Sequence, residues 1–294
     1  MPAEGENKRN EGSVQMSLRG QAAIVGIGEV PSRRNYPGHT AISLMAEATA
    51  LALEDAHLTK GDIDGIITNA HTITPMAMAG YLQLQPIFSE GTSMHGASGA
   101  QSIVIAAAAI MAGLCNTVLC VMGGARDAAG GGASVATEWE APFGPGAATT
   151  GQYALVKRRH MHEFGSKDEQ FAKMAVNQRF NALKNPNAVF QGQPLTLEDV
   201  LNSRYASEPI HLLETVMPCY GAAAAIVTSA ERARTLSSRP VYLLGAGAGA
   251  ISHEQIWQDP GHTMTTSAVS VTAKRAFAMS GYGPQDMQSA QFYD

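Results

Sequence analysis

The sequence has few charged, few aromatic and few cysteine residues, and each shortage excludes a class of protein. Charged side chains make up 15% of the 294 residues and aromatic side chains 6%, against 45% apolar residues. This balance is typical of a globular chain with a large buried core and excludes a largely disordered one. The net charge of −5 is too small for an acidic interaction tail. Because the net charge is negative, the sequence as a whole also lacks the basic character of a nucleic-acid-binding protein.

The three cysteines form neither a disulfide framework nor a zinc-binding pattern. They are Cys115, Cys120 and Cys219, and their spacing matches no metal-ligand motif, so we expect no metal site. The location we expect is therefore a reducing cytoplasm. Cys219 precedes a predicted strand and is the best candidate of the three for a reactive thiol, although a structural role also fits it.

The sequence also lacks a signal peptide and a membrane-spanning segment. Residues 1–17 are polar and mixed in charge, which predicts a disordered N-terminal tail. The longest apolar stretch, from Ile103 to Gly124, is interrupted by Gly113 and Asn116. This interruption predicts a buried helix followed by a strand rather than a membrane span.

What the sequence does contain is an alternation of strand and helix patterns. Strands are predicted over residues 21–28, 65–68 and 117–122, and helices over residues 40–56 and 100–113. A strand–helix–strand order is typical of parallel strands joined by a right-handed crossover, so we expect the first two strands to pair. Residues 18–122 are thus predicted to form the first part of an α/β domain.

The second part of the chain begins with an inserted region at residues 123–210. Its glycine- and alanine-rich start is typical of a cover over a site or a partner surface. Helices are predicted over residues 151–183 and 197–203. Residues 211–294 are predicted to hold the end of the first domain and the start of a second α/β half. In that half we expect strands at 221–229 and 241–247 and a helix at 266–280.

The loop "TSMHGASGAQS", from Thr92 to Ser102, leads directly into the apolar helix pattern. Small residues before a helix let another group approach the backbone closely, and the N–H groups at the helix start favour an anion or oxyanion. Tight packing of a buried helix against the sheet is the alternative interpretation. The loop residues alone do not choose between the two.

Other motifs carry weaker signals. "GIG" at residues 26–28 lacks the third glycine of a dinucleotide fingerprint, and the glycines after residue 123 lack the Gly-Lys-Ser/Thr of a P-loop.

His160 and His162 stand two apart on a predicted helix, so they point to different faces and suit no shared metal. The basic run from Lys157 to Arg159 could bind phosphates of an acyl-CoA or pair with nearby acids.

Four stretches in this order resemble the thiolase superfamily. They are "AAIVGIGEVPSRR", "TSMHGASGAQSIVIAAAAIMAG", "NPNAVFQGQPLTLEDVLNSRYASEPIHLLE" and "MPCYGAAAAIVTSAERAR". The resemblance covers the chain from Leu18 onward. It is strongest to the branch of sterol-carrier-protein-type thiolases, lipid-transfer proteins and acetyl-CoA acetyltransferase-like proteins. It implies a layered α/β/α fold of two βαβαβ halves, the second incomplete in this chain.

The departures from the thiolase pattern concern its chemistry. Catalytic thiolases carry a cysteine two residues before a Ser-Gly pair, and here Ser98-Gly99 is retained while Gly96 stands at the cysteine position. Glycine has no side chain and cannot form the acyl-thioester intermediate. The stretch around Cys219 lacks the aspartate of its relatives. The family's C-terminal histidine and second cysteine would lie beyond Asp294, which we interpret as a truncated second half.

The resemblance therefore implies an enzyme of lipid or steroid-type metabolism that acts on acyl-CoA thioesters by retro-aldol cleavage without a covalent cysteine. No cofactor is expected, because coenzyme A is part of the substrate. The implied site consists of the catalytic candidates Tyr293, His95 and Ser98 and the substrate-binding loop residues Gly96, Ala97 and Gly99. A homodimer is expected, together with a small partner protein of OB-fold and zinc-ribbon type. The alternatives are a non-catalytic acyl-CoA or lipid-binding protein, a subunit of a complex, and an inactive gene fragment.

Overall fold

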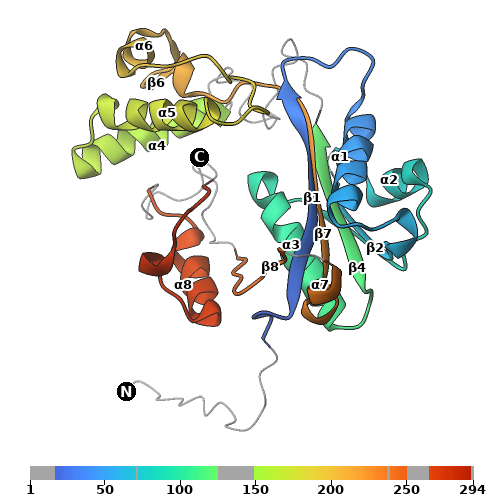
Figure 1. The fold of residues 1–294 in the computed structure, drawn as a ribbon. Coiled ribbons are helices and arrows are strands. Elements are labelled where there is room, and N and C mark those ends of the chain that lie inside the picture. The colour runs from blue at the N-terminus through green and yellow to red at the C-terminus, as the bar shows by residue number, and fades with distance from the viewer. Residues whose placement is uncertain (1–16, 71, 125–148, 237–238, 250–264, 293–294) are drawn as a thin grey trace, which may run out of the picture.

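The computed structural model describes residues 17–70, 72–124, 149–236, 239–249 and 265–292. Its centre is a six-stranded mixed sheet with the strand order β3-β2-β4-β7-β1-β8 (Figure 1). The strands are β1 (Ala22–Arg33), β2 (Gly65–Asn69), β3 (Phe88–Thr92), β4 (Thr117–Gly124), β7 (Tyr220–Ser229) and β8 (Val241–Tyr242). The mixed α/β fold that the sequence predicts is therefore confirmed.

Helices cover both faces of this sheet. On one face α1 (Ala41–Asp55), α2 (Pro75–Leu82) and α7 (Ala230–Leu236) share a core with the buried residues of β1, β2, β4 and β7. On the other face α3 (Ser98–Met111) packs its alanines against Ile67, Val118 and Val227. Figure 1 shows α3 on the side of the sheet opposite α1 and α2. The sheet is thus the middle of three layers.

Glycines at the start of the chain let α1 lie against β1. A Cβ atom at Gly28 would collide with the carbonyl oxygen of Ala48, and one at Gly26 with that of Ala52. The "GIG" motif therefore serves close helix–sheet packing rather than dinucleotide binding. Thr40 caps the same helix, because its hydroxyl accepts a hydrogen bond from the backbone N–H of Ser43 at 3.3 Å.

The strand pairing differs from the sequence prediction in two ways. β2 is parallel to β3 and β4, whereas β7 is antiparallel to both β4 and β1. β1 and β2 run in the same direction but do not pair, because β4 and β7 lie between them. β7, predicted as a strand of a second half, is a central strand of this first sheet. Its alanines are narrow enough for helices to pack closely on that part of the sheet.

The predicted strand at 241–247 is also shorter than expected. Only Val241–Tyr242 pairs with β1, and the chain then runs along α8 (Val269–Ser280). A Cβ atom at Gly245 would collide with the carbonyl oxygen of Ala276, and one at Gly247 with that of Thr272. The glycines of this stretch therefore serve close packing on a helix, which the strand pattern did not reveal.

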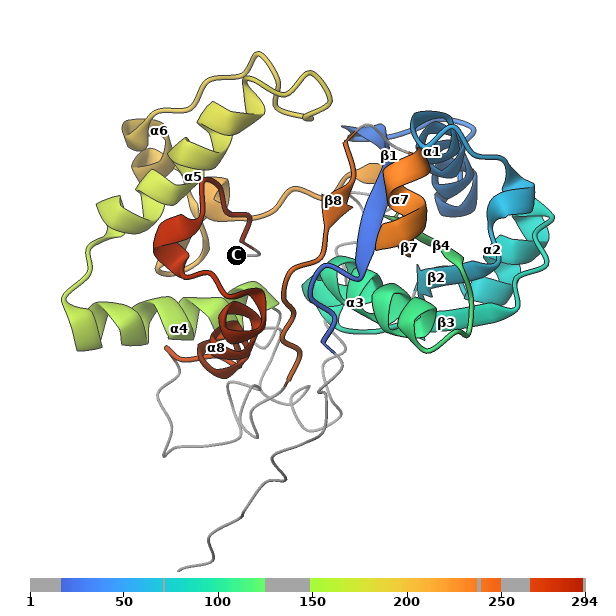
Figure 2. The ribbon, with the colours of Figure 1, turned by 60° about the horizontal axis from the view of Figure 1, so that its bottom comes forward.

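A second group of helices lies beside the sheet, as Figures 1 and 2 both show. It consists of α4 (Thr149–Phe164), α5 (Asp168–Ala182), α6 (Leu197–Asn202), and the hairpin of β5 (Tyr205–Ser207) and β6 (Ile210–His211). These helices confirm the helical segments predicted at 151–183 and 197–203. In the part of the chain that the structure describes, no helix is long and apolar enough to span a membrane.

Candidate functional site

The loop from Thr92 to Ser102 lies at the edge of the sheet where the parallel strands have their carboxyl ends. β3 ends at Thr92, a 3-10 turn follows at His95–Ala97, and α3 begins at Ser98. The helix starts two residues earlier than the sequence pattern predicts, so Ser98 and Gly99 belong to its first turn. In open α/β sheets, ligands bind outside this edge.

Ser98 supports the loop from inside. Its side chain is buried, and its hydroxyl oxygen accepts a hydrogen bond from the backbone N–H of Met94 at 2.9 Å. The N–H of Ala97 donates to the carbonyl oxygen of Met94 at 3.0 Å. These two bonds close the turn and fix the direction in which α3 begins.

The structure brings four of the predicted site residues together at the start of α3. Gly96, Ala97 and Gly99 are exposed around the buried Ser98. The first N–H groups of a helix have no acceptor within it, so this turn can hold an oxyanion. Tyr293 lies outside the described residues, and so does the side chain of His95, whose backbone forms part of the 3-10 turn.

A pocket of about 370 Å³ opens at the same edge of the sheet. Its walls come from the carboxyl ends of β1, β2 and β4 and from the start of β7. The lining residues are Glu29, Val30, Ser32, Asn69, Met122, Gly123, Gly221, Ala222 and Ala223. Several of them lie in the stretches that resemble the thiolase superfamily, but no sequence pattern marked them as lining residues, because the pocket exists only once four strands have assembled.

The floor of this carboxyl-edge pocket is a row of cross-strand neighbours. Met122 pairs with Ala223, and Ala223 pairs with Glu29. At the other end of the row Asn69 pairs with Thr92, the last residue before the loop. Asn69 stands two residues after Ile67, which packs in the α3-side core, and alternate residues of a strand share a face. The row of Glu29, Ala223, Met122 and Asn69 thus lies with the loop on the α3 side of the sheet, whereas the side chains of Val30 and Ala222 pack into the core on the α1 side.

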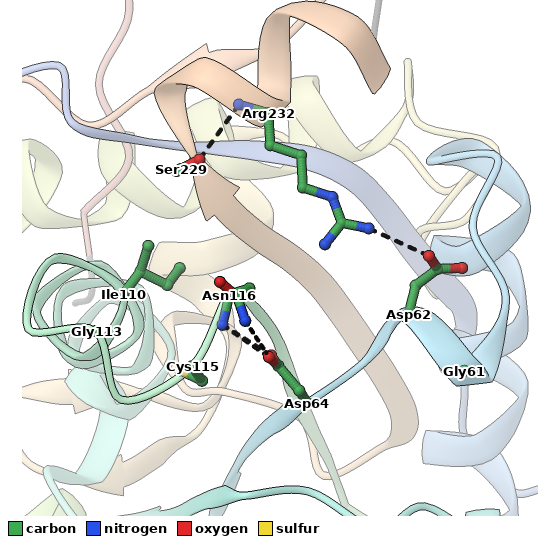
Figure 3. Close-up of a pocket in the computed structure, with 9 residues that line it drawn as sticks. All are labelled: Gly61, Asp62, Asp64, Ile110, Gly113, Cys115, Asn116, Ser229 and Arg232. Atoms are coloured by element: carbon green, nitrogen blue, oxygen red, sulfur yellow. Dashed lines mark hydrogen bonds and ion pairs between the residues drawn. The ribbon is translucent and has the colours of Figure 1, made fainter.

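A larger pocket, about 440 Å³, lies at the opposite, amino edge of the parallel strands (Figure 3). Its polar groups bind one another. The Asp64 carboxylate accepts bonds from Asn116 N at 2.9 Å, Asn116 Nδ2 at 2.7 Å and Thr117 N at 2.7 Å. Arg232 donates to Thr117 Oγ1 at 2.6 Å and pairs with Asp62 at 3.2 Å. This arrangement ties β2, β4 and α7 together and suits a structural role.

The folded structure shifts the pKa values of one carboxyl group and two thiols in this part of the molecule. Hydrogen bonds from the backbone and hydroxyl of Thr59, with a smaller contribution from Arg232, hold the pKa of Asp62 below 3.8. Burial raises the pKa of the Cys115 thiol to about 11 and that of Cys120 to about 12. Both thiols are therefore protonated and unreactive near neutral pH. No group of three potential metal ligands occurs among the residues that the structure describes.

The basic run in the middle of α4 pairs with acids. Lys157 is buried, and its Nζ lies 3.0 Å from carboxylate oxygens of both Glu214 and Asp168. Arg158 pairs with Glu208 and Arg159 with Glu163. The structure thus shows the pairing with nearby acids, one of the two interpretations that the sequence left open.

Comparison with known proteins agrees with this fold. No protein-family model matches the chain. The chain is 33% identical to a steroid side-chain-cleaving aldolase of Thermomonospora curvata, over 94% of this chain and 75% of the relative. It is also 33% identical to a 17-hydroxy-3-oxo-4-pregnene-20-carboxyl-CoA lyase of Mycobacterium tuberculosis, over 94% and 76% of the two chains.

A solved structure of an aldolase also matches this chain. The chain superimposes on an Ltp2-ChsH2(DUF35) aldolase with a TM-score of 0.82 and 32% identity, covering 92% of this chain and 72% of that one. A monomeric SCP2-thiolase-like protein of Mycobacterium smegmatis, 20% identical, shares the fold with a TM-score of 0.72. The protein belongs to the thiolase superfamily, and within it to the branch of SCP2-thiolase-like proteins and Ltp2-type aldolases.

Proposed function

We propose that this protein cleaves a carbon–carbon bond of a β-hydroxyacyl-CoA thioester by a retro-aldol reaction. Both relatives at 33% identity are named for carbon–carbon cleavage, one of a steroid side chain and one of a steroid carboxyl-CoA. The observation that carries the proposal is the loop at the start of α3. It offers backbone donors at a ligand-binding edge, and Gly96 provides no nucleophile there.

The reaction needs two kinds of group. A base takes the proton of the β-hydroxyl, the carbon–carbon bond breaks, and its electron pair passes to the thioester as an enolate. The enolate then takes a proton at carbon, so the products are a ketone and a shorter acyl-CoA. The negative charge develops on the enolate oxygen, and the N–H groups at the start of α3 would stabilise it. Gly96, Ala97 and Gly99 would bind the thioester here.

The proton carrier in this proposal is Tyr293, with His95 as the second candidate. Both remain assignments by resemblance to the family. Ser98 would act by holding the loop, since its hydroxyl accepts the Met94 N–H at 2.9 Å. Gly96 at the position of the thiolase cysteine means that no acyl-enzyme forms at this point of the loop.

The proposed assembly is a homodimer with a small partner protein. β3 is an edge strand of the sheet, and an unpaired strand edge can add a strand from a second copy. The solved aldolase relative is named Ltp2-ChsH2(DUF35) aldolase, which indicates a DUF35 component. We therefore expect a DUF35-type protein of OB-fold and zinc-ribbon type to accompany this chain in the cytoplasm.

The test is to incubate the protein, with a DUF35-type partner, with 17-hydroxy-3-oxo-4-pregnene-20-carboxyl-CoA. We expect equal amounts of a steroid ketone and a shorter acyl-CoA by mass spectrometry, with no mass added to the protein. A thioester adduct after incubation with acetyl-CoA would contradict the non-covalent mechanism. Tight binding of the substrate without cleavage, with the partner present, would favour the lipid-binding alternative instead.

A further inference from the structure

We propose that the carboxyl-edge pocket binds the apolar acyl portion of the substrate, and that Ala223 sets how bulky this portion can be. The inference rests on the proposed function, because that function supplies the thioester at the start of α3. It goes further by assigning the acyl group, rather than the coenzyme A portion, to a defined set of residues. Four observations support it.

The first observation is continuity between the pocket and the loop. The row Glu29–Ala223–Met122 crosses β1, β7 and β4 in register. Asn69 lies on the next strand, paired with Thr92, where the loop begins. A thioester carbonyl held by the loop would therefore have this row beside it, on the same side of the sheet.

The second observation is the chemistry of the lining. Two thirds of the lining residues are glycine, alanine or apolar side chains, and the polar ones stand at the pocket's ends. Small-molecule pockets combine mainly apolar walls with a few polar groups that fix orientation. The polar lining residues are Glu29, Ser32 and Asn69. An acyl group with a large apolar body and a polar substituent matches this distribution.

The third observation is the size of the pocket. Its volume of about 370 Å³ lies near the lower end of the range of roughly 300–1,000 Å³ that is usual for small-molecule sites. A complete coenzyme A thioester exceeds a drug-sized ligand and would not fit. The acyl group alone is of suitable size, and the coenzyme A portion would extend outside.

The fourth observation is the position of Ala223 in the floor. Its side chain is exposed, and its cross-strand neighbours are Met122 on one side and Glu29 on the other. A loop beyond α5 holds the far end of the row, since Asn187 Nδ2 donates to Glu29 at 3.3 Å and Ser32 N–H donates to Asn187 O at 3.0 Å. A larger side chain at 223 would occupy the pocket without displacing the core.

The experiment compares Ala223→Phe with Ala206→Phe, which places the same side chain at an exposed alanine of β5 outside the pocket. Calorimetry with the whole chain measures dissociation constants for a steroid carboxyl-CoA and for acetyl-CoA. We expect Ala223→Phe to weaken steroid-CoA binding at least about tenfold and acetyl-CoA binding less than about twofold. Ala206→Phe should change neither. A tenfold change corresponds to about 1.4 kcal/mol.

Unchanged steroid-CoA binding in Ala223→Phe would overturn the proposal, as would an equal loss for both ligands. Ala223→Met serves as the second variant if the phenylalanine variant does not fold, with a smaller selective loss expected. Because binding is measured without turnover, the two proposals can fail separately. A wild-type protein that binds the steroid-CoA selectively but does not cleave it overturns the proposed function and leaves the pocket assignment standing.

Discussion

The two edges of the central sheet each hold a pocket, and they differ in how their polar groups are used. At the amino edge, Asp64 binds three N–H groups of Asn116 and Thr117, and Arg232 binds Asp62 and Thr117. At the carboxyl edge, the pocket that contains Met122 and Ala223 is lined mainly by small and apolar residues. It lies on the same edge of the sheet as the first turn of α3. The larger pocket is therefore the structural one.

Pocket volume alone therefore does not identify a binding site. Charged groups that satisfy one another lower the energy of the fold and leave little for a ligand to gain. Small residues next to a helix start leave space and donors for one. Changes at the amino edge should therefore alter stability, and changes at the carboxyl edge should alter binding and turnover.

The largest effect is expected from Asp64→Ala at the amino edge. Removal of the carboxylate leaves the three N–H groups of Asn116 and Thr117 without this acceptor, which we expect to cost about 3 kcal/mol of unfolding free energy. Urea unfolding measures this. The affinity of the folded protein for acyl-CoA should stay unchanged, and a parallel loss of affinity would remove the distinction between the edges.

Ser98→Ala tests the carboxyl edge and should cost less stability. The Met94 N–H loses its acceptor, at about 1 kcal/mol, while the turn before α3 loosens. Turnover of the β-hydroxyacyl-CoA should fall about tenfold or more, measured as kcat at saturating substrate.

Thr49→Val is the matched control for Ser98→Ala. It removes a buried hydroxyl of α1 that donates to Met45 O at 2.8 Å, far from the loop. Equal losses of kcat in the two variants would show that Ser98 has no special part in the loop.

A smaller effect is expected from the pH dependence of the Asp62 contact. Hydrogen bonds from Thr59 lower the pKa of Asp62, so its stabilisation is present above pH 3.8 and is lost as the pH falls through the lower folded-state value. Because Asp62 is one-third exposed, the contribution stays below about 1 kcal/mol. Asp62→Asn should therefore lower the urea midpoint at pH 6 and have less effect below pH 3. An equal effect at both pH values would contradict this account.

The smallest change is expected in the reactivity of the buried thiols. With pKa values raised to about 11 and 12, Cys115 and Cys120 carry almost no thiolate at pH 8, whereas Cys219 is only half-buried. Iodoacetamide should label Cys219 first in the native protein, as peptide mass mapping would show. All three should react in concentrated urea. Fast native labelling of Cys120 would show that the α3-side core opens readily.

Local patterns predicted most of the elements because each depends on residues close together in the chain. The helical spacing after Thr40 and the apolar runs of β2 and β4 placed α1 and both strands within a few residues. The start of α3 was missed by two residues because Ser98 enters the first turn as a loop support. That role requires Met94 to be folded back against it.

The alternating α/β order, the resemblance to the thiolase superfamily and the loop before α3 could all be predicted, since each lies in contiguous residues. The position of β7 between β1 and β2, and the pocket shared by Glu29, Asn69, Met122 and Ala223, emerged only from the folded chain. The folded chain also showed that Lys157 pairs with acids. These features depend on residues that are distant in the chain, such as the paired residues of β1 and β7 or Lys157 and Glu214. The energies of these pairings depend on the packed fold and leave no local pattern in the chain.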